Sequence, residues 1–418
     1  MKTDNPRRLA FDSLKKCARD GKYSNLEVMT SLSRAQLDGR DKALYTALVY
    51  GVIEKGITLD YLISRVSSRP IDKLDTDTLI SIRLGLYQIM HMDKIPDFSA
   101  CDESVKLVPH SSKSFVNAVL RNLLKNKEKL KKELETAPLS VKYSVPQWII
   151  DLWERGYGRA KVEEILEGFE KKPPMTVRVN TLKTTVKELM SNVDGQLHPQ
   201  LDDVVYASGN VESLYGFEEG LFFVQGSNSR KAVSALKLKP DETVIDTCAC
   251  PGGKSFSAAI DMENRGTVYS FDLHANKLSL VQKGAERLGI NIITAQVQNA
   301  TSPREELLGK ADAVICDVPC SGLGIIAKKP DIKYKKPEDI ERLPEIQLSI
   351  LTASSGYLKK GGRMVYSTCT LNPEENERVT EAFLKEHSEF HRAEGFPKTA
   401  FPSEYSDDGF FYDLLIKD

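Results

Sequence analysis

Two cysteines lie in short polar corners that follow separate strand-like runs of the chain. The first corner is Asp-Val-Pro-Cys-Ser-Gly at residues 317–322 and contains Cys320, and the second is Ser-Thr-Cys-Thr at 367–370 and contains Cys369. A third corner, upstream of both, is the glycine-rich run at 246–254. Because a thiolate is a strong nucleophile, two such thiols near a nucleotide-type corner indicate nucleophilic catalysis beside a bound cofactor.

Methyl transfer to carbon 5 of a pyrimidine is one reaction that needs such a thiol. Carbon 5 is a poor nucleophile until a thiolate adds to carbon 6 and turns carbon 5 into an enamine-like donor that can attack a sulfonium methyl group. Asp317, hydrogen-bonded to ring nitrogen 3, would stabilise this adduct, and Lys254 would orient the base or the cofactor carboxylate. We therefore expect Cys369, Cys320, Asp317 and Lys254 in one catalytic site.

The glycine corner has the features of a site for a small cofactor. A buried strand ends at Asp246, a helix can begin at Ser255, and Gly252 and Gly253 between them allow close approach of a ligand to the backbone. The corner is not GxGxxG, and Lys254 lacks the context of a phosphate loop, which favours an adenosyl cofactor over a dinucleotide or a nucleoside triphosphate. A plain turn is the alternative.

Polar residues follow the next two strand-like runs as well. Asp272 is placed to accept hydrogen bonds from ribose hydroxyls, and Asn299 is placed to bond an adenine amino group. Alone, Asp272 could instead be the N-cap of a helix that begins near Ala275, and Asn299 could be a turn residue. Polar residues at successive strand ends together favour a cofactor cleft.

The other cysteines have simpler interpretations. Cys17, Cys101 and Cys316 fit buried positions, whereas Cys248 and Cys250 flank the glycine corner. Zinc binding through Cys316 and Cys320 is the competing account of the thiols, but there is no CxxC pair and the six histidines are scattered, so we expect no metal. Seven unevenly placed cysteines are typical of reduced thiols in a cytoplasmic protein.

The elements that would position these residues alternate regularly after residue 236. Strand-like runs end at Asp246, Asp272, Val297, Asp317 and Thr370, with helical stretches between them at 275–288 and 337–358. Such alternation predicts an α/β, Rossmann-like domain over residues 236–418, with a parallel sheet covered by helices on both faces. Ligands bind at the carboxyl ends of such strands, where every motif named above lies.

The front of the chain has a different pattern. Apolar residues at helical spacing predict an all-α domain over residues 1–135, with new helices after Pro70, Pro96 and Pro109 and an exposed last helix end at 125–135. Residues 136–235 read as a small mixed α/β segment, with a helix around Trp148 and strands at 175–180 and 221–225. At 418 residues the chain is long enough for these domains.

Charge and hydropathy limit the kinds of partner that the protein can have. Residues 1–140 hold 24 Lys+Arg against 18 Asp+Glu, whereas the remainder holds 34 against 41. The basic front fits an RNA-binding surface, although ordinary solvated surfaces explain it too. No apolar run is long enough to span a membrane, and the first residues lack a signal core, so we expect a cytoplasmic protein, and we expect a monomer.

Two polar segments lie beside the thiol corners. The run 372–377, Asn-Pro-Glu-Glu-Asn-Glu, predicts a helix start capped by Asn372, which would fix the corner that carries Cys369. The lysine cluster at 328–336 contains Tyr334 and suits a nucleic-acid backbone, with a solvated loop as the alternative.

At these motifs the chain resembles the RsmB-type RNA cytosine-5 methyltransferases, the Nop/Sun family. The segments that carry the resemblance are 246–254, 317–324, 329–333, 367–370, 373–376 and 408–411. The helical front, through Ala10 and the runs 49–51 and 117–121, resembles a NusB-like RNA-binding domain. This front favours the bacterial ribosomal-RNA branch of the family over a tRNA branch.

The resemblance implies S-adenosylmethionine as cofactor and RNA as substrate, specifically small-subunit (16S-type) ribosomal RNA. It implies Cys369 as the nucleophile and Cys320 as the thiol that assists product release. The implied cofactor contacts are Cys248, Ala249, Cys250, Pro251, Gly252, Gly253, Lys254, Asp272, Asn299 and Asp317. Three residues depart from the family pattern: Asn299 replaces a common aspartate, Gly226 an acidic residue, and Cys250 an alanine.

Two alternatives to this interpretation differ in mechanism or in class. Cys320 could be the nucleophile, like the Pro-Cys cysteine of DNA cytosine methyltransferases, but those enzymes lack a second thiol at the position of Cys369. A non-catalytic RNA-binding or antitermination-type protein with a decayed enzyme domain is the other alternative, and the intact motifs at all the strand ends argue against it.

Overall fold

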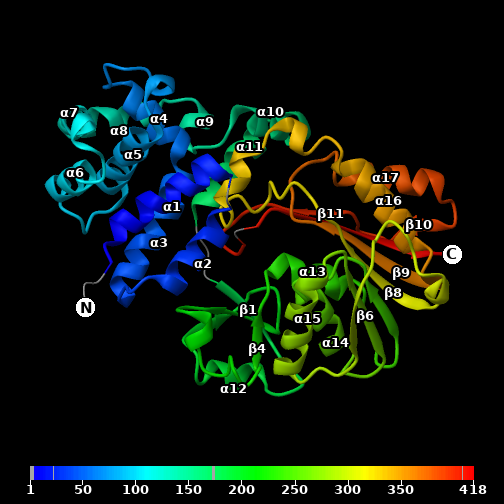
Figure 1. Cartoon of the computed structure of the whole chain (residues 1–418). Coiled ribbons are helices and arrows are strands. Elements are labelled where there is room, and N and C mark those ends of the chain that lie inside the picture. Colours follow the sequence, from blue (N-terminus) through cyan, green and yellow to red (C-terminus); the bar gives the residue numbers. More distant parts are fainter. Residues whose placement is uncertain (1–3, 22, 172–174, 407) are drawn as a thin grey trace. The chain divides into compact units, whose positions relative to one another are not determined.

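The structure is a computed structural model that describes residues 4–21, 23–171, 175–406 and 408–418 (Figure 1). The chain divides into two compact units. Unit 1 is Met1–Leu152 with Lys329–Lys335, and unit 2 is Trp153–Lys328 with Lys336–Asp418.

Unit 1 is built from helices around one apolar core. Its helical elements are α1 (Pro6–Asp20), α2 (Ser24–Arg34), α3 (Gly39–Glu54), α4 (Gly56–Ser64), η1 (Ile71–Lys73), α5 (Thr76–His91), α6 (Asp97–Val105), α7 (His110–Lys125), α8 (Lys127–Glu135) and α9 (Leu139–Lys142). Leu48, Leu59, Ile82 and Leu120, from four different helices, are fully buried in the core. The expected all-α front is therefore confirmed.

Most of the expected helix starts in unit 1 are found, and one expected helix divides. Pro96 and Pro109 directly precede α6 and α7, and Pro70 precedes the short 3-10 turn η1. The lysine-rich run 125–135 is not the end of the preceding helix, because α7 ends at Lys125 and α8 is a separate helix. The backbone of Asn126 leaves the helical region, with φ −100° and ψ 9°, and the chain turns there.

A short segment from late in the sequence completes unit 1. It contains the 3-10 helix η4 (Pro330–Tyr334). The Asp331 carboxylate accepts hydrogen bonds from the amide and the hydroxyl of Ser24, the first at 3.1 Å, and the Tyr334 hydroxyl donates to the Ile53 carbonyl at 2.8 Å. Lys333 is only 8% exposed. Asp331 and Tyr334 thus anchor this segment to α2 and α3, while Lys328, Lys329 and Lys336 are exposed, so nucleic-acid binding by the cluster stays a prediction.

Unit 2 begins with a small antiparallel sheet. Its strands are β1 (Met175–Val179), β2 (Gly195–Leu197), β3 (Val204–Ala207) and β4 (Phe222–Val224), in the order β2-β3-β1-β4. The helices of this part are α10 (Gln147–Tyr157), which spans the boundary of the two units, α11 (Arg159–Glu170) and α12 (Val186–Met190). Val177, Val179, Leu189 and Phe222 are buried in its core. The strands expected at 175–180 and 221–225 are present.

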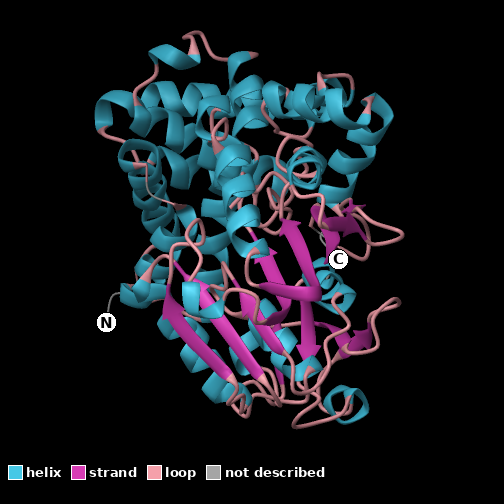
Figure 2. Cartoon of the chain, turned by 90° about the vertical axis from the view of Figure 1, so that its right-hand side faces the viewer, coloured by secondary structure: helices cyan, strands magenta, loops and turns pink. Residues whose placement is uncertain are grey.

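The main sheet of unit 2 is parallel in its centre. Its strands are β5 (Thr243–Asp246), β6 (Thr267–Asp272), β7 (Ile293–Val297), β8 (Ala311–Asp317), β9 (Leu358–Thr368), β10 (Phe390–Arg392), β11 (Lys398–Ala400) and β12 (Phe410–Lys417). The order is β10-β12-β9-β8-β5-β6-β7, with β5 to β9 parallel to one another, and β11 pairs with β12. Figure 2 shows strands, in magenta, that lie side by side among the helices.

Helices cover both faces of this sheet. The residues of α13 (Ser227–Ala235), α14 (Gly253–Asp261) and α15 (Ala275–Leu288) pack into one apolar cluster, and those of α16 (Leu343–Ser355) and α17 (Glu377–Glu386) pack into another. This is the expected α/β, Rossmann-like arrangement. Short 3-10 turns η2 (Val211–Ser213), η3 (Glu305–Leu307) and η5 (Pro337–Asp339) complete the elements.

The expected strand and helix limits agree with the structure except near the thiol corners. Four strands end where predicted, at Asp246, Asp272, Val297 and Asp317, but β9 ends at Thr368 and leaves Cys369 beyond it. The helix expected at 337–358 is shorter, because η5 precedes it and α16 begins at Leu343. The antiparallel β12 between β9 and β10 was not predicted.

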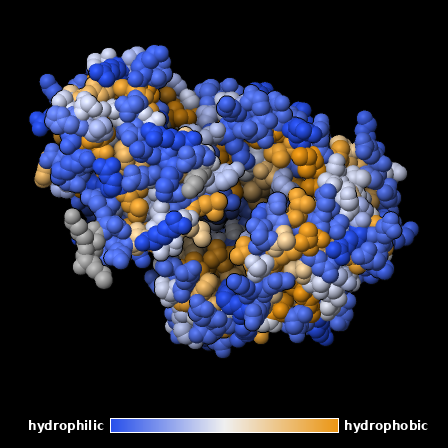
Figure 3. Space-filling model, in the orientation of Figure 1, coloured by the Kyte–Doolittle hydropathy of each residue, from blue (hydrophilic) through white to orange (hydrophobic). Residues whose placement is uncertain are grey.

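No helix among the described residues is long and apolar enough to cross a membrane. On the face drawn in Figure 3, hydrophilic residues predominate and hydrophobic ones are interspersed among them. The domain limits expected at 135/136 and 235/236 stay a prediction.

Candidate active site

The glycine corner joins the end of β5 to the start of α14. Gly252 is the N-cap of α14, with φ +115°, and no side chain in the described part of the chain caps the helix there. A Cβ atom at Gly252 would lie 2.4 Å from the Phe256 ring, whereas one at Gly253 would meet no described heavy atom within 4 Å. The position of a Gly253 side chain is therefore open, and the first-turn N–H groups of a helix start without a side-chain cap can act as donors for an anionic group.

Hydrogen bonds beneath the corner hold its shape. Asp246 is fully buried and accepts a hydrogen bond from the Ser255 hydroxyl at 2.6 Å, which ties the strand end to the first turn of α14. Burial raises the pKa of Asp246 to about 7. Ala249 donates its N–H to the Phe271 carbonyl at 2.7 Å, and Gly252 donates to the Ala249 carbonyl at 2.7 Å. The Cys250–Pro251 peptide is cis.

The two cysteines of the corner have raised thiol pKa values. Burial raises the pKa of the Cys248 thiol well above its usual value. Burial, with the nearby Asp272 carboxylate, raises the pKa of Cys250 to about 12. Small neutral side chains therefore line the corner.

Asp272 and Asn299 lie at the ends of the next strands. One Asp272 oxygen accepts the His274 N–H at 2.9 Å, but the N-cap of α15 is His274, so Asp272 is not that cap. Asn299 is exposed, and its side-chain oxygen accepts hydrogen bonds from the amide and hydroxyl of Thr301 at 3.1 and 2.9 Å. That contact is the turn considered as an alternative for Asn299.

These positions fit an adenosyl cofactor. The open space beside Gly253 and the uncapped start of α14 suit its carboxylate, and the partly exposed Asp272 suits a ribose diol. Asn299 keeps an amide group at the end of β7, the next strand of the sheet. No group of three or more His, Cys, Asp or Glu side chains in the described ranges could hold a metal ion.

The two thiol corners meet, because they follow neighbouring parallel strands. Asp317 at the end of β8 pairs in register with Ser367 of β9, and the Cys320 and Cys369 sulfurs lie 3.3 Å apart. Both cysteines are free. The hydrogen bond between the two sulfurs lowers the pKa of Cys369, with a further contribution from the Lys254 ammonium, whereas that bond and burial raise the pKa of Cys320. The pair is thus chemically unequal, with Cys369 the more acidic thiol.

Lys254 and Asp317 form an ion pair beside the thiols. The Lys254 Nζ lies 2.6 Å from the Asp317 carboxylate, whose other oxygen accepts the Ser367 hydroxyl at 2.7 Å. Burial alone would lower the pKa of Lys254, but the Asp317 carboxylate raises it above its usual value. The ammonium also lies 5.4 Å from the centre of the Phe410 ring. The four residues expected to be catalytic therefore lie together.

Ser367 and Phe410 are contacts of this site that the sequence analysis did not identify. Ser367 directly precedes the Thr-Cys-Thr corner and, at the end of a strand beside Asp317, offers a hydroxyl to it. Phe410 reaches Lys254 from β12, the strand that was not predicted. The Asp-Gly-Phe-Phe run at 408–411, already noted as a family motif, was the signal available for it.

The helix start after Cys369 differs from the expectation. The helix α17 begins at Glu377, with Asn376 as its N-cap residue, so Asn372 does not cap it. Asn372 instead accepts the Glu374 N–H at 3.2 Å and forms a separate turn. The side chain of Asn376 does not cap α17 either, because it is bound elsewhere. Its amide oxygen accepts the Thr368 hydroxyl at 2.6 Å, and its NH2 group donates to the Thr370 carbonyl at 3.0 Å.

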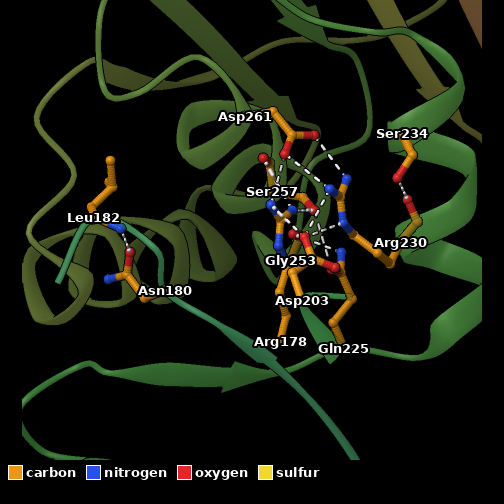
Figure 4. A network of polar contacts seen from close by, with 10 residues as sticks. All are labelled: Arg178, Asn180, Leu182, Asp203, Gln225, Arg230, Ser234, Gly253, Ser257 and Asp261. Carbon is orange, nitrogen blue, oxygen red and sulfur yellow. Dashed lines mark hydrogen bonds and ion pairs between the residues drawn. The ribbon is translucent and has the colours of Figure 1, made fainter. Parts of the chain in front are cut away.

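A buried ionic network supports α14 from the small sheet (Figure 4). Arg178 of β1, only 1% exposed, donates to the Asp261 carboxylate at 2.7 Å and also bonds the carbonyl and hydroxyl of Ser257. Arg230 of α13 contacts both Asp203 and Asp261 at 2.8 Å. Two arginines and two aspartates thus fix the helix whose start forms the glycine corner.

Models of known families match three segments of the chain. The 16S rRNA methyltransferase RsmB/F model matches residues 233–416, the NusB family model matches 4–125, and a ferredoxin-like domain of RsmF/B-like methyltransferases matches 145–196. This order agrees with the fold class expected from the sequence.

Relatives match over nearly the whole length. The probable ribosomal RNA small subunit methyltransferase B of Bacillus subtilis is 37% identical over 406 residues, which are 93% of this chain and 90% of that relative. The probable enzyme of the same name from Synechocystis sp. is 32% identical over 98% of this chain and 99% of its own. Among solved structures, PH0851 superposes with a TM-score of 0.78 at 25% identity and covers 100% of both chains.

Proposed function

The chain belongs to the 16S rRNA methyltransferase RsmB/F family, and from this premise we propose that it methylates carbon 5 of a cytosine in small-subunit ribosomal RNA through a covalent Cys369–cytosine adduct. Its cofactor is S-adenosylmethionine, as for the methyltransferase family. The 3.3 Å pair of unequal thiols beside the glycine corner is the observation that supports this reaction best.

Cys369 is the nucleophile in this proposal. The hydrogen bond with Cys320 lowers the pKa of Cys369, which favours its thiolate, and Cys369 follows β9 at the carboxyl edge of the sheet. The thiolate adds to carbon 6, the sulfur–carbon bond forms, and the electron pair of the carbon 5–carbon 6 double bond moves toward ring nitrogen 3. S-adenosylmethionine, when bound, supplies a sulfonium methyl group for carbon 5.

Lys254 and Asp317 stabilise the adduct because they supply a proton to ring nitrogen 3 of the cytosine. The ammonium that Asp317 holds at 2.6 Å carries a proton that the pair can direct to ring nitrogen 3 as negative charge develops there. Ser367 orients the carboxylate from its other oxygen. The pair therefore acts as the acid that was first assigned to Asp317 alone.

Cys320 assists release of the product. After methylation the carbon 5 proton passes to a solvent water, its electron pair re-forms the double bond, and the sulfur–carbon bond breaks. The Cys369 sulfur leaves as a thiol with the proton that Cys320 gives up, and return of this proton across the 3.3 Å contact restores the starting pair. Cys320 has a raised pKa, so it is the thiol of the pair, and it donates a proton to the departing sulfur over 3.3 Å. The cofactor contacts are proposed to be residues 248–254, Asp272, Asn299 and Asp317, and the RNA contacts of the basic front remain part of the proposal.

A pair of thiol variants tests the proposal. With RNA and cofactor present, we expect Cys369→Ala to abolish turnover without a trapped complex. We expect Cys320→Ala to accumulate a denaturant-stable protein–RNA adduct, seen as a shifted band on a denaturing gel. Trapping by Cys369→Ala instead would make Cys320 the nucleophile, and methylation at an atom other than carbon 5 of cytosine would overturn the reaction.

A further inference from the structure

A buried carboxylate lies between the two thiol corners. Glu375 is 0% exposed, and it comes after β9 and before the start of α17. One of its oxygens accepts the Ser321 N–H at 2.8 Å and the side-chain amide of Gln347 at 2.9 Å, and the other accepts the side-chain amide of Asn372 at 2.9 Å. The carboxylate therefore contacts the residue after Cys320 and the turn after Cys369.

The corner that carries Cys320 is held on both sides. Gln347 of α16 donates to the Pro319 carbonyl at 2.9 Å, and the Ser321 hydroxyl lies 2.7 Å from the Thr370 hydroxyl. Because Gln347 also donates to Glu375, the peptide groups before and after Cys320 are both fixed through this carboxylate. The backbone on both sides of Cys320 is therefore held in place, which keeps its sulfur close to that of Cys369.

The corner that carries Cys369 is held through the same residue. Asn372 is three residues beyond Cys369, and the Tyr366 hydroxyl, from β9, donates to the Glu375 carbonyl at 2.6 Å. The Cys369 carbonyl accepts the Gly324 N–H at 3.0 Å, which joins the two corners once more. The two Glu375 oxygens therefore join Ser321 of the Cys320 corner to Asn372, in the turn just after the Cys369 corner.

We propose that Glu375 is a positioning residue that holds Cys320 in register with Cys369 for release of the methylated base. The proposal rests on the proposed function, and it adds a residue that touches neither substrate nor sulfur. The three partners of the carboxylate, the backbone N–H of Ser321 and the side-chain amides of Gln347 and Asn372, are all donors, so a group that accepts on both oxygens satisfies them. The negative charge of Glu375 also helps to keep the Cys320 thiol protonated, after the larger effects of the Cys369 hydrogen bond and burial.

Glu375→Gln is the sharpest test, because it keeps size and replaces one acceptor with a donor. The amide NH2 would face either Asn372 or the Ser321 and Gln347 donors, so at least one hydrogen bond that now holds a corner is lost. We expect kcat to fall roughly 10- to 100-fold, with KM for RNA little changed, because misplacement acts on the chemical steps. We also expect a denaturant-stable protein–RNA adduct to accumulate, as for Cys320→Ala, while the Kd of S-adenosylmethionine stays within about twofold of wild type.

Glu374→Gln is the matched control. Glu374 is the adjacent residue, its side chain is 51% exposed, and it pairs with Arg378 on the surface. This variant should turn over like wild type and trap nothing. If Glu375→Gln does not fold, Gln347→Leu offers a second route, since it removes the contacts to Pro319 and Glu375 and should trap the same adduct.

The outcomes separate the two proposals. Trapping by Cys320→Ala without trapping by Glu375→Gln or Gln347→Leu would overturn the positioning role and leave the proposed function standing. Loss of cofactor binding in step with a lowered melting temperature would show a merely structural role for Glu375 and would also overturn the inference. Absence of any adduct in Cys320→Ala would contradict the proposed function, and the inference with it.

Discussion

Lys254 connects the acid and the nucleophile of the site. It pairs with Asp317 at 2.6 Å, and its positive charge adds to the Cys320 hydrogen bond in lowering the pKa of Cys369. Lys254 thus has two effects: it supplies a proton for the cytosine ring, and it increases the thiolate fraction of Cys369. The pH dependence of the rate can separate these two effects.

Lys254→Met should lower kcat/KM and move the inflection of its pH profile to higher pH. Without the cation the pKa of Cys369 rises, so the thiolate fraction near neutral pH falls and is recovered only at higher pH. We expect kcat/KM at pH 7 to fall roughly 100-fold and its inflection to move upward by about one pH unit. Lys283→Met, an exposed position on α15, is the control. An unchanged inflection would mean that the charge of Lys254 does not act on Cys369.

Asp246 should make the stability of the protein depend on pH. Its pKa is about 7 in the fold against 3.8 ordinarily, so the stability it contributes is fully present below the ordinary pKa and is lost as pH rises through about 7. Relative to Asp246→Asn, the free energy of unfolding of wild type should fall by roughly 2–3 kcal/mol between about pH 5 and pH 7. Urea unfolding at both values measures this. Asp241→Asn, at an exposed position, should show no such difference, and parallel curves for Asp246→Asn would contradict the prediction.

At the scale of elements, the position of α14 depends on the small sheet. Arg178, Arg230, Asp203 and Asp261 join β1, α13, the segment before β3 and the end of α14 in one network. Burial lowers the pKa of Arg178, although both aspartates favour its charged form. The helix whose start is proposed to bind the cofactor is therefore fixed at its other end by arginines of β1 and α13.

Removal of Arg178 should weaken both the fold and the cofactor site. Arg178→Met leaves two largely buried carboxylates with Arg230 alone, which costs about 3–5 kcal/mol of unfolding free energy by the usual effect of breaking a buried pair. We expect S-adenosylmethionine affinity to fall as well, because α14 loses its anchor. Denaturant unfolding and calorimetric titration measure the two effects. Arg159→Met removes only the exposed ion pairs with Glu154 and Glu163 and should change the free energy of unfolding by less than about 1 kcal/mol. A similarly small change for Arg178→Met would contradict the argument.

The element pattern shows why part of the site was predictable. The strands ending at Asp246, Asp272 and Asp317 are short apolar runs followed directly by polar residues, so their ends, and the motifs on them, could be located from the chain. That Cys320 and Cys369 lie at the same edge of the sheet followed from the parallel arrangement of the strands, but the adjacency of β8 and β9 did not. The antiparallel β12 could not be located in this way, because its pairing with β9 joins residues far apart in sequence. The contact of Phe410 with Lys254 depends on that pairing.

At the scale of the whole molecule, unit 1 includes contacts between residues that are far apart in the sequence, and such contacts cannot be predicted from local sequence. The N-cap residue of α2 is Tyr23, which has no capping side chain, and the carboxylate at the helix start comes from Asp331. Local sequence around residue 24 contains no sign of this, and the lysines around residue 331 indicated a nucleic-acid surface or a solvated loop. A charged segment can therefore contain a residue, here Asp331, whose structural contact is not evident from the composition of the segment.

Asp331→Ala should loosen α2 although it lies 307 residues away from it. The Ser24 amide and hydroxyl lose their acceptor, and loss of such a cap costs about 1–2 kcal/mol. We expect hydrogen exchange of amides in α2 (Ser24–Arg34) to accelerate roughly 5- to 30-fold, as that free energy implies, while exchange in β5 and β8 stays unchanged. Lys329→Ala, exposed in the same segment, should leave both regions as in wild type. Equal protection of α2 in Asp331→Ala and wild type would show that the carboxylate does not cap the helix in solution, whereas faster exchange throughout unit 2 would show a general loss of stability in place of a local one.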